Sequence, residues 1–197
     1  HENEYGVGAP FSWGLNLITH DEPGWVAGWV QQCASAPEAE QNIAERVLGH
    51  IHSLSPESAR VLAAGLPALP VKTAQTVLGS VRWILNDLAV LPELDAPQKE
   101  TAQVLCQMLW DELTNAQNVE VRPLVLRALG HIPRDFAPHT WQVLLAFTPQ
   151  PNEQETFAAW ADDWARRTLS SAACAALMRR TIVNRYSSTS GGSSAVA

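Results

Sequence analysis

Three prolines spaced by 41 residues constrain the fold of this chain more than any other feature. Pro56, Pro97 and Pro138 each follow a short polar connection and open a run of apolar residues with helical spacing. A proline is tolerated in the first turn of a helix, because its missing N–H would have no partner there. The spacing therefore predicts a unit of 41 residues in which a helix begins at the same place in every copy.

Two sequence matches at twice this period support the repeat. Residues 48–51 (LGHI) recur as residues 129–132, 81 positions later. Residues 61–67 (VLAAGLP) align with residues 143–149 (VLLAFTP) at an offset of 82. Similarity at a fixed period is the sequence signature of repeat architectures. We expect the equivalent residues of the copies to be buried between adjacent repeats: Leu48, Ile51, Leu91, Leu129 and Ile132.

The apolar runs inside each unit have a helical period, and nothing in the chain has the alternation of a strand. Within residues 37–54, Ile43, Val47, Ile51 and Leu54 follow helical spacing and are expected on one apolar face. The second helices of successive units are expected at 73–91, 118–132 and 152–170, the second one capped by Asn118. Two helices in each unit predict an all-α protein built from about four helical hairpins.

Residues 118–122 (NVEVR) and 126–132 (LRALGHI) carry a resemblance to a known family. They resemble the second helix of the HEAT-like (armadillo-type) helical-hairpin repeats, and the resemblance spans about 37–170. It implies a right-handed α-solenoid whose concave face binds a protein or peptide, and it implies no particular chemistry. The chain departs from the family's pattern at residues 86–89 (NDLA) and at Pro123, which is expected to kink its helix.

The sequence predicts three segments. Residues 1–20 contain Gly and Pro without a clean period and are expected to be an irregular lead-in. Residues 21–186 are predicted to form one α-solenoid domain, and the Ser/Gly-rich residues 187–197 a flexible tail. Near the domain's ends lie two tryptophan pairs with i, i+4 spacing, which either cover the open ends or anchor a partner: Trp25 and Trp29, and Trp160 and Trp164.

Composition limits the partners and the compartment. A net charge of −7 disfavours a general binder of phosphate backbones, and no run approaches the ~18 apolar residues of a membrane span. Cys33, Cys106 and Cys174 form no C-x-x-C pair and are expected to be buried in helices. We expect a soluble cytoplasmic protein without a membrane partner; secretion stays open because the chain starts at His1 rather than Met.

Motifs for catalysis, phosphate binding, dinucleotides or zinc are absent from the sequence, so no cofactor and no metal is expected. His50 and His52 diverge by about 200° on a helix and cannot share a metal. His50 and His131 fall in equivalent last turns, where capping of end carbonyls is expected. The adjacent pairs Asp111-Glu112 and Asp162-Asp163 are expected on solvated helix faces.

The leading functional hypothesis is a non-catalytic scaffold or adaptor that binds another protein through its second helices. The alternatives left open are a HEAT-like nucleic-acid-binding protein, including a base-excising type, and an enzyme of unidentified class. A deep pocket holding a perturbed carboxylate would favour the enzyme. The residues predicted to contact the partner are polar or large positions of the second helices: Arg82, Trp83, Asn86, Arg122, Arg127, Trp164 and Arg167.

Overall fold

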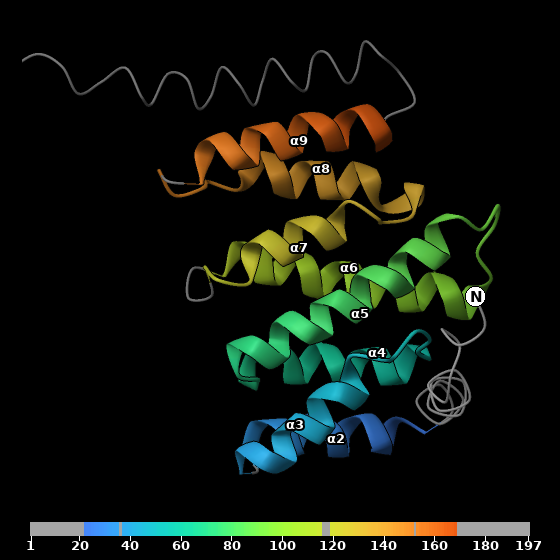
Figure 1. Ribbon diagram of the computed structural model, residues 1–197. Coiled ribbons are helices and arrows are strands. Elements are labelled where there is room, and N and C mark those ends of the chain that lie inside the picture. The colour runs from blue at the N-terminus through green and yellow to red at the C-terminus, as the bar shows by residue number, and fades with distance from the viewer. Residues whose placement is uncertain (1–21, 36, 116–118, 152, 169–197) are drawn as a thin grey trace, which may run out of the picture. The chain divides into compact units, whose positions relative to one another are not determined.

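A computed structural model describes residues 22–35, 37–115, 119–151 and 153–168. These residues form eight α-helices and two short 3-10 helices, with no strand among them (Figure 1). The all-helical prediction is confirmed. The predicted lead-in, the predicted tail and Cys174 lie outside the described residues.

The chain divides into two compact units at the bond between Pro133 and Arg134, where the sequence predicts one domain over 21–186. Unit 1 contains the helices up to Pro133, and unit 2 contains those that follow. Each unit is described by itself.

Unit 1 arranges its helices in two layers (Figure 1). In one, which we call the even layer, α4 packs against both α2 and α6; in the other, the odd layer, α5 packs against both α3 and α7. The layers join where α2 packs on α3 and α6 on α7. The elements are α2 (Pro23–Ser35), α3 (Glu38–Leu48), α4 (Pro56–Gly65), η1 (Leu66–Ala68), α5 (Val71–Ala89), α6 (Ala96–Thr114) and α7 (Arg122–Leu129).

The prolines begin helices as predicted. Pro56 is the first residue of α4, and Ser55 before it accepts a hydrogen bond from the Ser58 N–H through its hydroxyl. Pro97 is the second residue of α6, where Asp95 and Gln98 form a reciprocal capping box. These caps satisfy backbone N–H groups that have no partner inside the helix.

Pro123 also begins a helix, and the predicted kink is wrong. Helix α7 starts at Arg122, so Pro123 is its second residue and removes no helical hydrogen bond. The N–H groups of Leu124 and Val125 both donate to the carbonyl of Val121. The predicted cap, Asn118, lies outside the described residues.

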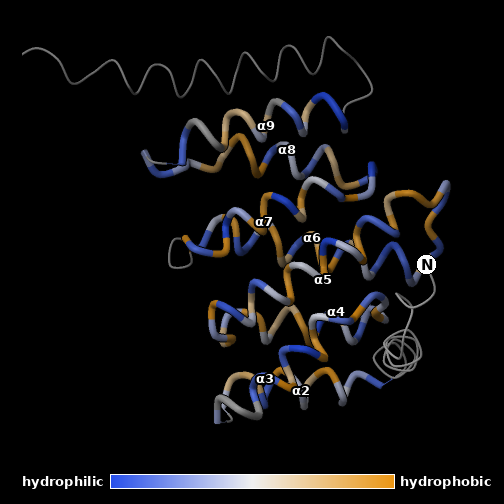
Figure 2. The backbone as a smooth tube through the Cα atoms, in the orientation of Figure 1, coloured by the Kyte–Doolittle hydropathy of each residue, from blue (hydrophilic) through white to orange (hydrophobic). Residues whose placement is uncertain are grey.

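The core of unit 1 contains four of the five repeat-equivalent residues: Leu48, Ile51, Leu129 and Ile132 are buried, as predicted. Apolar and polar residues alternate along the helices in the pattern that this burial requires (Figure 2). Leu91 is the exception at 40% exposed, and that prediction is wrong. The connection after α5 spans residues 90–95, one residue shorter than residues 49–55 after α3, so Leu91 lacks the place that Ile51 occupies. Ile43 on α3 is also exposed, not part of the predicted apolar face.

Buried hydroxyls tie successive helices within each layer. Ser80 of α5 donates to the carbonyl of Leu48, the last residue of α3, at 2.9 Å. Thr101 of α6 donates to the carbonyl of Leu54, just before α4, at 3.3 Å. Each bond satisfies a carbonyl near a helix terminus, where an intrahelical partner is missing or the chain has left the helix.

Unit 2 contains η2 (Arg134–Phe136), α8 (Ala137–Ala146) and α9 (Gln154–Thr168), and Pro138 is the second residue of α8. Phe147, just after α8, meets Phe157 of α9 edge to face, with ring centroids 5.1 Å apart. Trp160 and Trp164 stack at 6.3 Å, and Trp164 is fully buried, as expected for a residue that covers a core.

Candidate functional site

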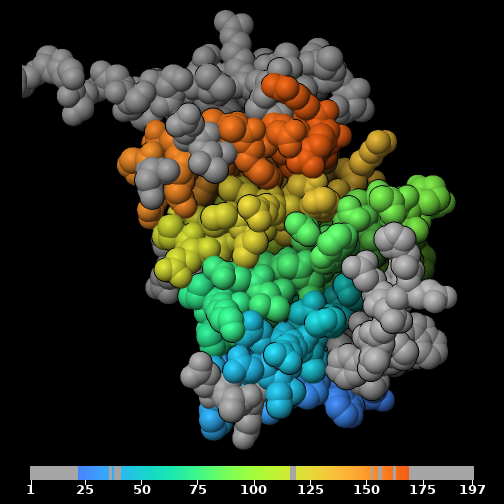
Figure 3. All heavy atoms as spheres, in the orientation of Figure 1, coloured from blue at the N-terminus to red at the C-terminus, as the bar shows by residue number. Residues whose placement is uncertain are grey.

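The odd layer of unit 1 carries most of the exposed large apolar side chains. Of the six found among the described residues, five lie on α3, on α5 or just after α5. Figure 3 looks onto this layer. Exposed apolar residues that gather on one surface mark an interaction site more often than scattered ones do. The five are Ile43, Val71, Trp83, Val90 and Leu91, and the sixth, Trp25, is on α2.

Trp83 is the largest of these side chains and is 50% exposed on α5. The guanidinium of Arg82 lies 5.0 Å from the centroid of the Trp83 ring, within cation–π distance. One turn before Trp83, Gly79 leaves the helix backbone open: a Cβ built there meets nothing within 4 Å. The exposed ring of Trp83 and the open backbone at Gly79 can together contact a side chain of a partner.

Asn86 joins this part of α5 to α7. Its side-chain oxygen can only accept, so Nδ1 of His131 donates to it at 3.0 Å. Arg82 and Arg127 each precede this bond by one turn on helices that pack together, which places both arginines along the same stretch of the odd layer. Through this bond His131, just after α7, links the end of that helix to α5.

The odd layer carries one arginine on each helix without a carboxylate beside it. No described carboxylate forms an ion pair with Arg46 of α3, Arg82 of α5 or Arg127 of α7. Glu45 is already engaged, since it pairs with Lys72 at 3.3 Å and accepts a hydrogen bond from Thr76 at 3.1 Å. Asp87, one turn after Trp83 on α5, is exposed as well, so the odd layer carries charges of both signs.

The seven predicted contact residues do not form one site. Arg82, Trp83, Asn86 and Arg127 lie together on the odd layer. Arg122 is only 5% exposed, and its guanidinium donates to the carbonyl of Asn115 at 3.4 Å. In unit 2, Trp164 is buried and the exposed Arg167 pairs with Asp163 at 2.8 Å. Neither Arg122 nor Trp164 offers its side chain to a partner.

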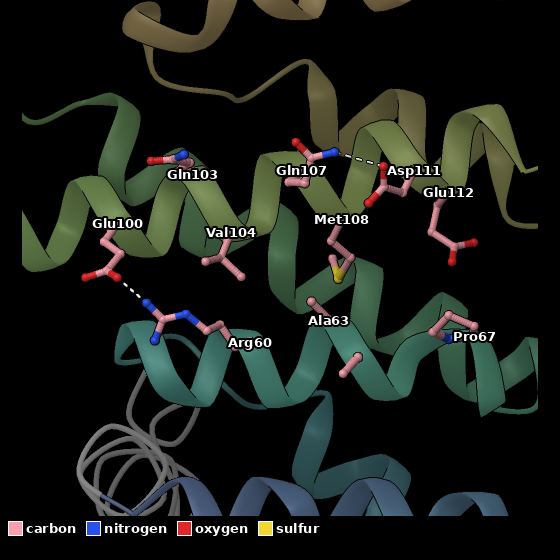
Figure 4. A pocket seen from close by; sticks show the side chains of 11 residues that line it. Arg60, Ala63, Pro67, Glu100, Gln103, Val104, Gln107, Met108, Asp111 and Glu112 are labelled. Carbon is pink, nitrogen blue, oxygen red and sulfur yellow. Dashed lines mark hydrogen bonds and ion pairs between the residues drawn. The ribbon is translucent and has the colours of Figure 1, made fainter.

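Glu112 is the residue whose role the sequence did not reveal. It was expected on a solvated face with Asp111, yet it is 4% exposed and lines a groove between α4 and α6 (Figure 4). Burial, and secondarily the charge of Asp111, raises the pKa of the Glu112 carboxyl. Its i, i+4 spacing from Met108 places it on the same face of α6 as an apolar residue. That spacing is the one signal that could have distinguished it from Asp111.

The other candidate chemical groups have structural roles. Nδ1 of His50 donates to the carbonyl of Arg46 at 2.7 Å, which confirms the predicted capping at the end of α3. Cys33 and Cys106 are buried in helices, as predicted. Burial, with a smaller contribution from the charge of Glu45, raises the pKa of the Cys33 thiol to about 11, and burial also raises that of Cys106. Thiols with raised pKa values are poor nucleophiles.

Two further findings concern only the part of the chain that the structure describes. It contains no group of three or more His, Cys, Asp or Glu side chains arranged to hold a metal ion. It also contains no helix that combines the length and the apolar character needed to cross a membrane.

Comparison of the chain with protein-family models, with curated proteins and with solved structures finds no match. The HEAT-like resemblance of residues 118–132 stays a prediction, and the function has to be inferred from the surfaces of the two units.

Proposed function

We propose that this chain is a HEAT-like helical-repeat scaffold, and that the odd layer of unit 1 binds a segment of another protein. The order of helices supports the repeat: first helices α2, α4 and α6 form one layer and second helices α3, α5 and α7 the other. Stacked hairpins of this kind present one layer as an extended binding surface. The right-handed solenoid and the concave face belong to the same proposal.

The observation that carries the proposal is the exposed Trp83 with its flanking arginines. Tryptophan and arginine are the residues most enriched among the dominant contacts of protein interfaces. Here Trp83 is half exposed, Arg82 lies over its ring, and Arg127 stands on the neighbouring helix. Residues 82–86 lie within α5, and the His131–Asn86 bond links them to α7. Because this segment is already ordered, little conformational entropy is lost when a partner binds.

The charges of the odd layer define the partner's chemistry. Arginines without an ion pair attract acidic groups, and the half-exposed ring of Trp83 favours apolar ones. We therefore assign the surface to a protein segment that carries both acidic and apolar side chains. A nucleic acid offers negative charge as well, but the net charge of −7 opposes binding of a long phosphate backbone.

The test compares two tryptophans of matched exposure on opposite layers. Trp83→Ala on α5 and Trp25→Ala on α2 remove side chains that are 50% and 53% exposed. Each variant is used to capture proteins from a lysate of the source organism, with quantification by mass spectrometry. We expect proteins retained by the parent chain and by Trp25→Ala to be lost from Trp83→Ala. Arg82→Glu combined with Arg127→Glu should lose the same proteins while keeping the melting temperature.

Three outcomes would overturn this function. Retention of the same proteins by Trp83→Ala, or their equal loss from both tryptophan variants, would show that the odd layer is not the binding surface. Loss of all captured material after nuclease treatment, with direct binding of single-stranded DNA or RNA, would support the nucleic-acid alternative.

A further inference from the structure

A groove of about 560 Å³ runs between α4 and α6, in the even layer of unit 1 (Figure 4). Its volume falls within the ~300–1,000 Å³ typical of small-molecule sites. The sides of the groove are largely aliphatic, formed by Ala63, Ala64 and Pro67 from the α4 side and Val104 and Met108 from α6. The groove is separate from the odd layer, to which we assign the protein partner.

One face of α6 supplies a row of side chains along this groove. Glu100, Val104, Met108 and Glu112 follow each other at intervals of four residues, so they lie on one slowly turning face of the helix. The row is about 18 Å long at 1.5 Å per residue. It has an acidic residue at each end and apolar residues between them.

The two ends of the row differ in charge. At one end, Glu100 forms an ion pair with Arg60 of α4, which neutralises it (Figure 4). At the other end stand Asp111 and Glu112, and Arg60 is the only cation among the described residues that line the groove. Asp111 accepts a hydrogen bond from Gln107 at 2.8 Å, an uncharged donor. The second end therefore keeps an uncompensated negative charge.

The Glu112 side chain is only 4% exposed, and its carboxylate oxygens meet solvent in the groove. No described residue donates a hydrogen bond to its carboxylate, which points toward the Pro67 side of the groove in Figure 4. Such a carboxylate loses part of its hydration when it is ionised, and this loss is costly unless a cation or a donor replaces the water. Burial raises the pKa of Glu112 for the same reason. The protein thus holds an acceptor in the groove that its own described residues do not satisfy.

We propose that this groove binds a small aliphatic ammonium ion, with the charged nitrogen at Glu112 and Asp111 and the alkyl chain along Met108 and Val104. An ammonium group supplies three donors and the opposite charge, so it satisfies the acceptor that the chain leaves open. An anion would be repelled at the same end, and a neutral alcohol would supply a donor without charge. The aliphatic sides of the groove match the alkyl chain.

The experiment uses hexylammonium chloride as the probe and methyl NMR as the readout. The chain contains two methionines, Met108 and Met178, so a sample labelled at the methionine methyls gives one signal in the groove and one reference. Met108→Leu assigns the two signals. We expect hexylammonium to shift the Met108 signal in a saturable manner. Hexanol should bind about ten-fold more weakly and hexanoate more weakly still.

Matched variants locate the charge that is recognised. Glu112→Gln keeps the shape and removes the charge, so hexylammonium affinity should fall about ten-fold. Glu100→Gln changes the other end of the same row and should alter the affinity less than about two-fold, because Glu100 already pairs with Arg60. Circular dichroism melting of both variants checks that they remain folded.

The affinity should also depend on pH in a defined direction. The ammonium pairs with the ionised form of Glu112, so hexylammonium should bind more tightly as the pH rises through the raised pKa of that carboxyl. Asp111 on α6 is the charged group that acts on Glu112. Arg60 of α4 lies at the other end of the groove with Glu100, and no charged residue of α5 or α7 lines it. Glu112→Gln should lose this pH-dependent step.

The proposal fails if hexanol shifts the Met108 signal with the same affinity as hexylammonium, since this comparison is made on the unaltered chain and needs no variant. It also fails if Glu112→Gln binds hexylammonium unchanged, or if the Met108 and Met178 signals move together without saturation. Loss of protein capture through Trp83 would not affect it, because the two sites lie on different layers of unit 1.

Discussion

The two layers of unit 1 differ in which of their charged side chains lack an ion pair. On the odd layer, Arg82 lies over the ring of the half-exposed Trp83, and none of Arg46, Arg82 and Arg127 forms an ion pair with a described carboxylate. On the even layer, Asp111 and Glu112 stand without a cation in the groove between α4 and α6. A net charge of −7 describes neither surface. What a partner meets depends on the layer it approaches, and charge counted over the whole chain hides this difference.

Two glycines of unit 1 show how the local packing around a helix can differ from one position to another. In the even layer, Gly65 of α4 lies against Val30 of α2, and a Cβ on Gly65 would collide with the Val30 side chain. In the odd layer, Gly79 of α5 faces open space. The same residue type thus serves close packing in one layer and an open surface in the other. Substitutions that probe the shared core, the buried hydroxyls and these glycines can test the comparison, in order of expected effect.

The largest effect is expected in the core that both layers share. Leu129→Ala should lower the free energy of unfolding by about 2 to 5 kcal/mol, because Leu129 is fully buried and its removal leaves a cavity. Leu91→Ala, at the equivalent repeat position but 40% exposed, should cost about 0.5 kcal/mol or less. Urea denaturation measures both. A loss below about 0.5 kcal/mol for Leu129→Ala would contradict its place in the core.

Leu129 and Leu91 also show how far the sequence predicted the fold. The local signals were sufficient for the helix starts at Pro56 and Pro97, because a proline and its caps act within one turn. Helical period placed Leu129 inside correctly. Leu91 lies in the connection between α5 and α6. Whether a residue there is buried depends on the length of the connection, and an alignment of repeats does not predict that length.

The candidate site was predicted less completely. Trp83 and Trp164 align at an offset of 81, yet Trp83 is half exposed and Trp164 is buried against Trp160. Glu112 was assigned to a solvated face, although it is 4% exposed and lines the groove between α4 and α6. Each outcome depends on which other helix packs against the residue. Sequence period defines a face of a helix, but it does not say what lies opposite that face.

An intermediate effect is expected from the buried hydroxyls. Ser80→Ala in the odd layer should cost about 1 to 2 kcal/mol, because the carbonyl of Leu48 loses a buried donor at 2.9 Å. Thr101→Val in the even layer should cost less, since its bond to the Leu54 carbonyl is 3.3 Å long. Thermal and urea unfolding of the two variants gives the comparison.

Ser35→Ala serves as the control for the hydroxyl pair. Ser35 is exposed at the end of α2 and donates to the Gln31 carbonyl at 2.8 Å, a bond that water can replace. Its loss should change the unfolding free energy by less than about 0.5 kcal/mol. Equal losses for Ser80→Ala and Ser35→Ala would mean that burial adds nothing to the odd-layer bond.

The smallest effect is a gain, and it depends on the difference between the two glycines. Gly79→Ala should stabilise unit 1 by about 0.5 to 1 kcal/mol, because alanine restricts the unfolded chain, favours the helix and meets no neighbour at this position. Gly65→Ala should instead cost about 1 to 3 kcal/mol, since Val30 is branched at Cβ and buried and cannot easily move aside. Opposite signs in urea denaturation would confirm that Gly65 is closely packed and that Gly79 faces open space. A loss of stability for Gly79→Ala would show that the backbone beside Trp83 is covered, and would remove the open surface on which a partner is proposed to rest.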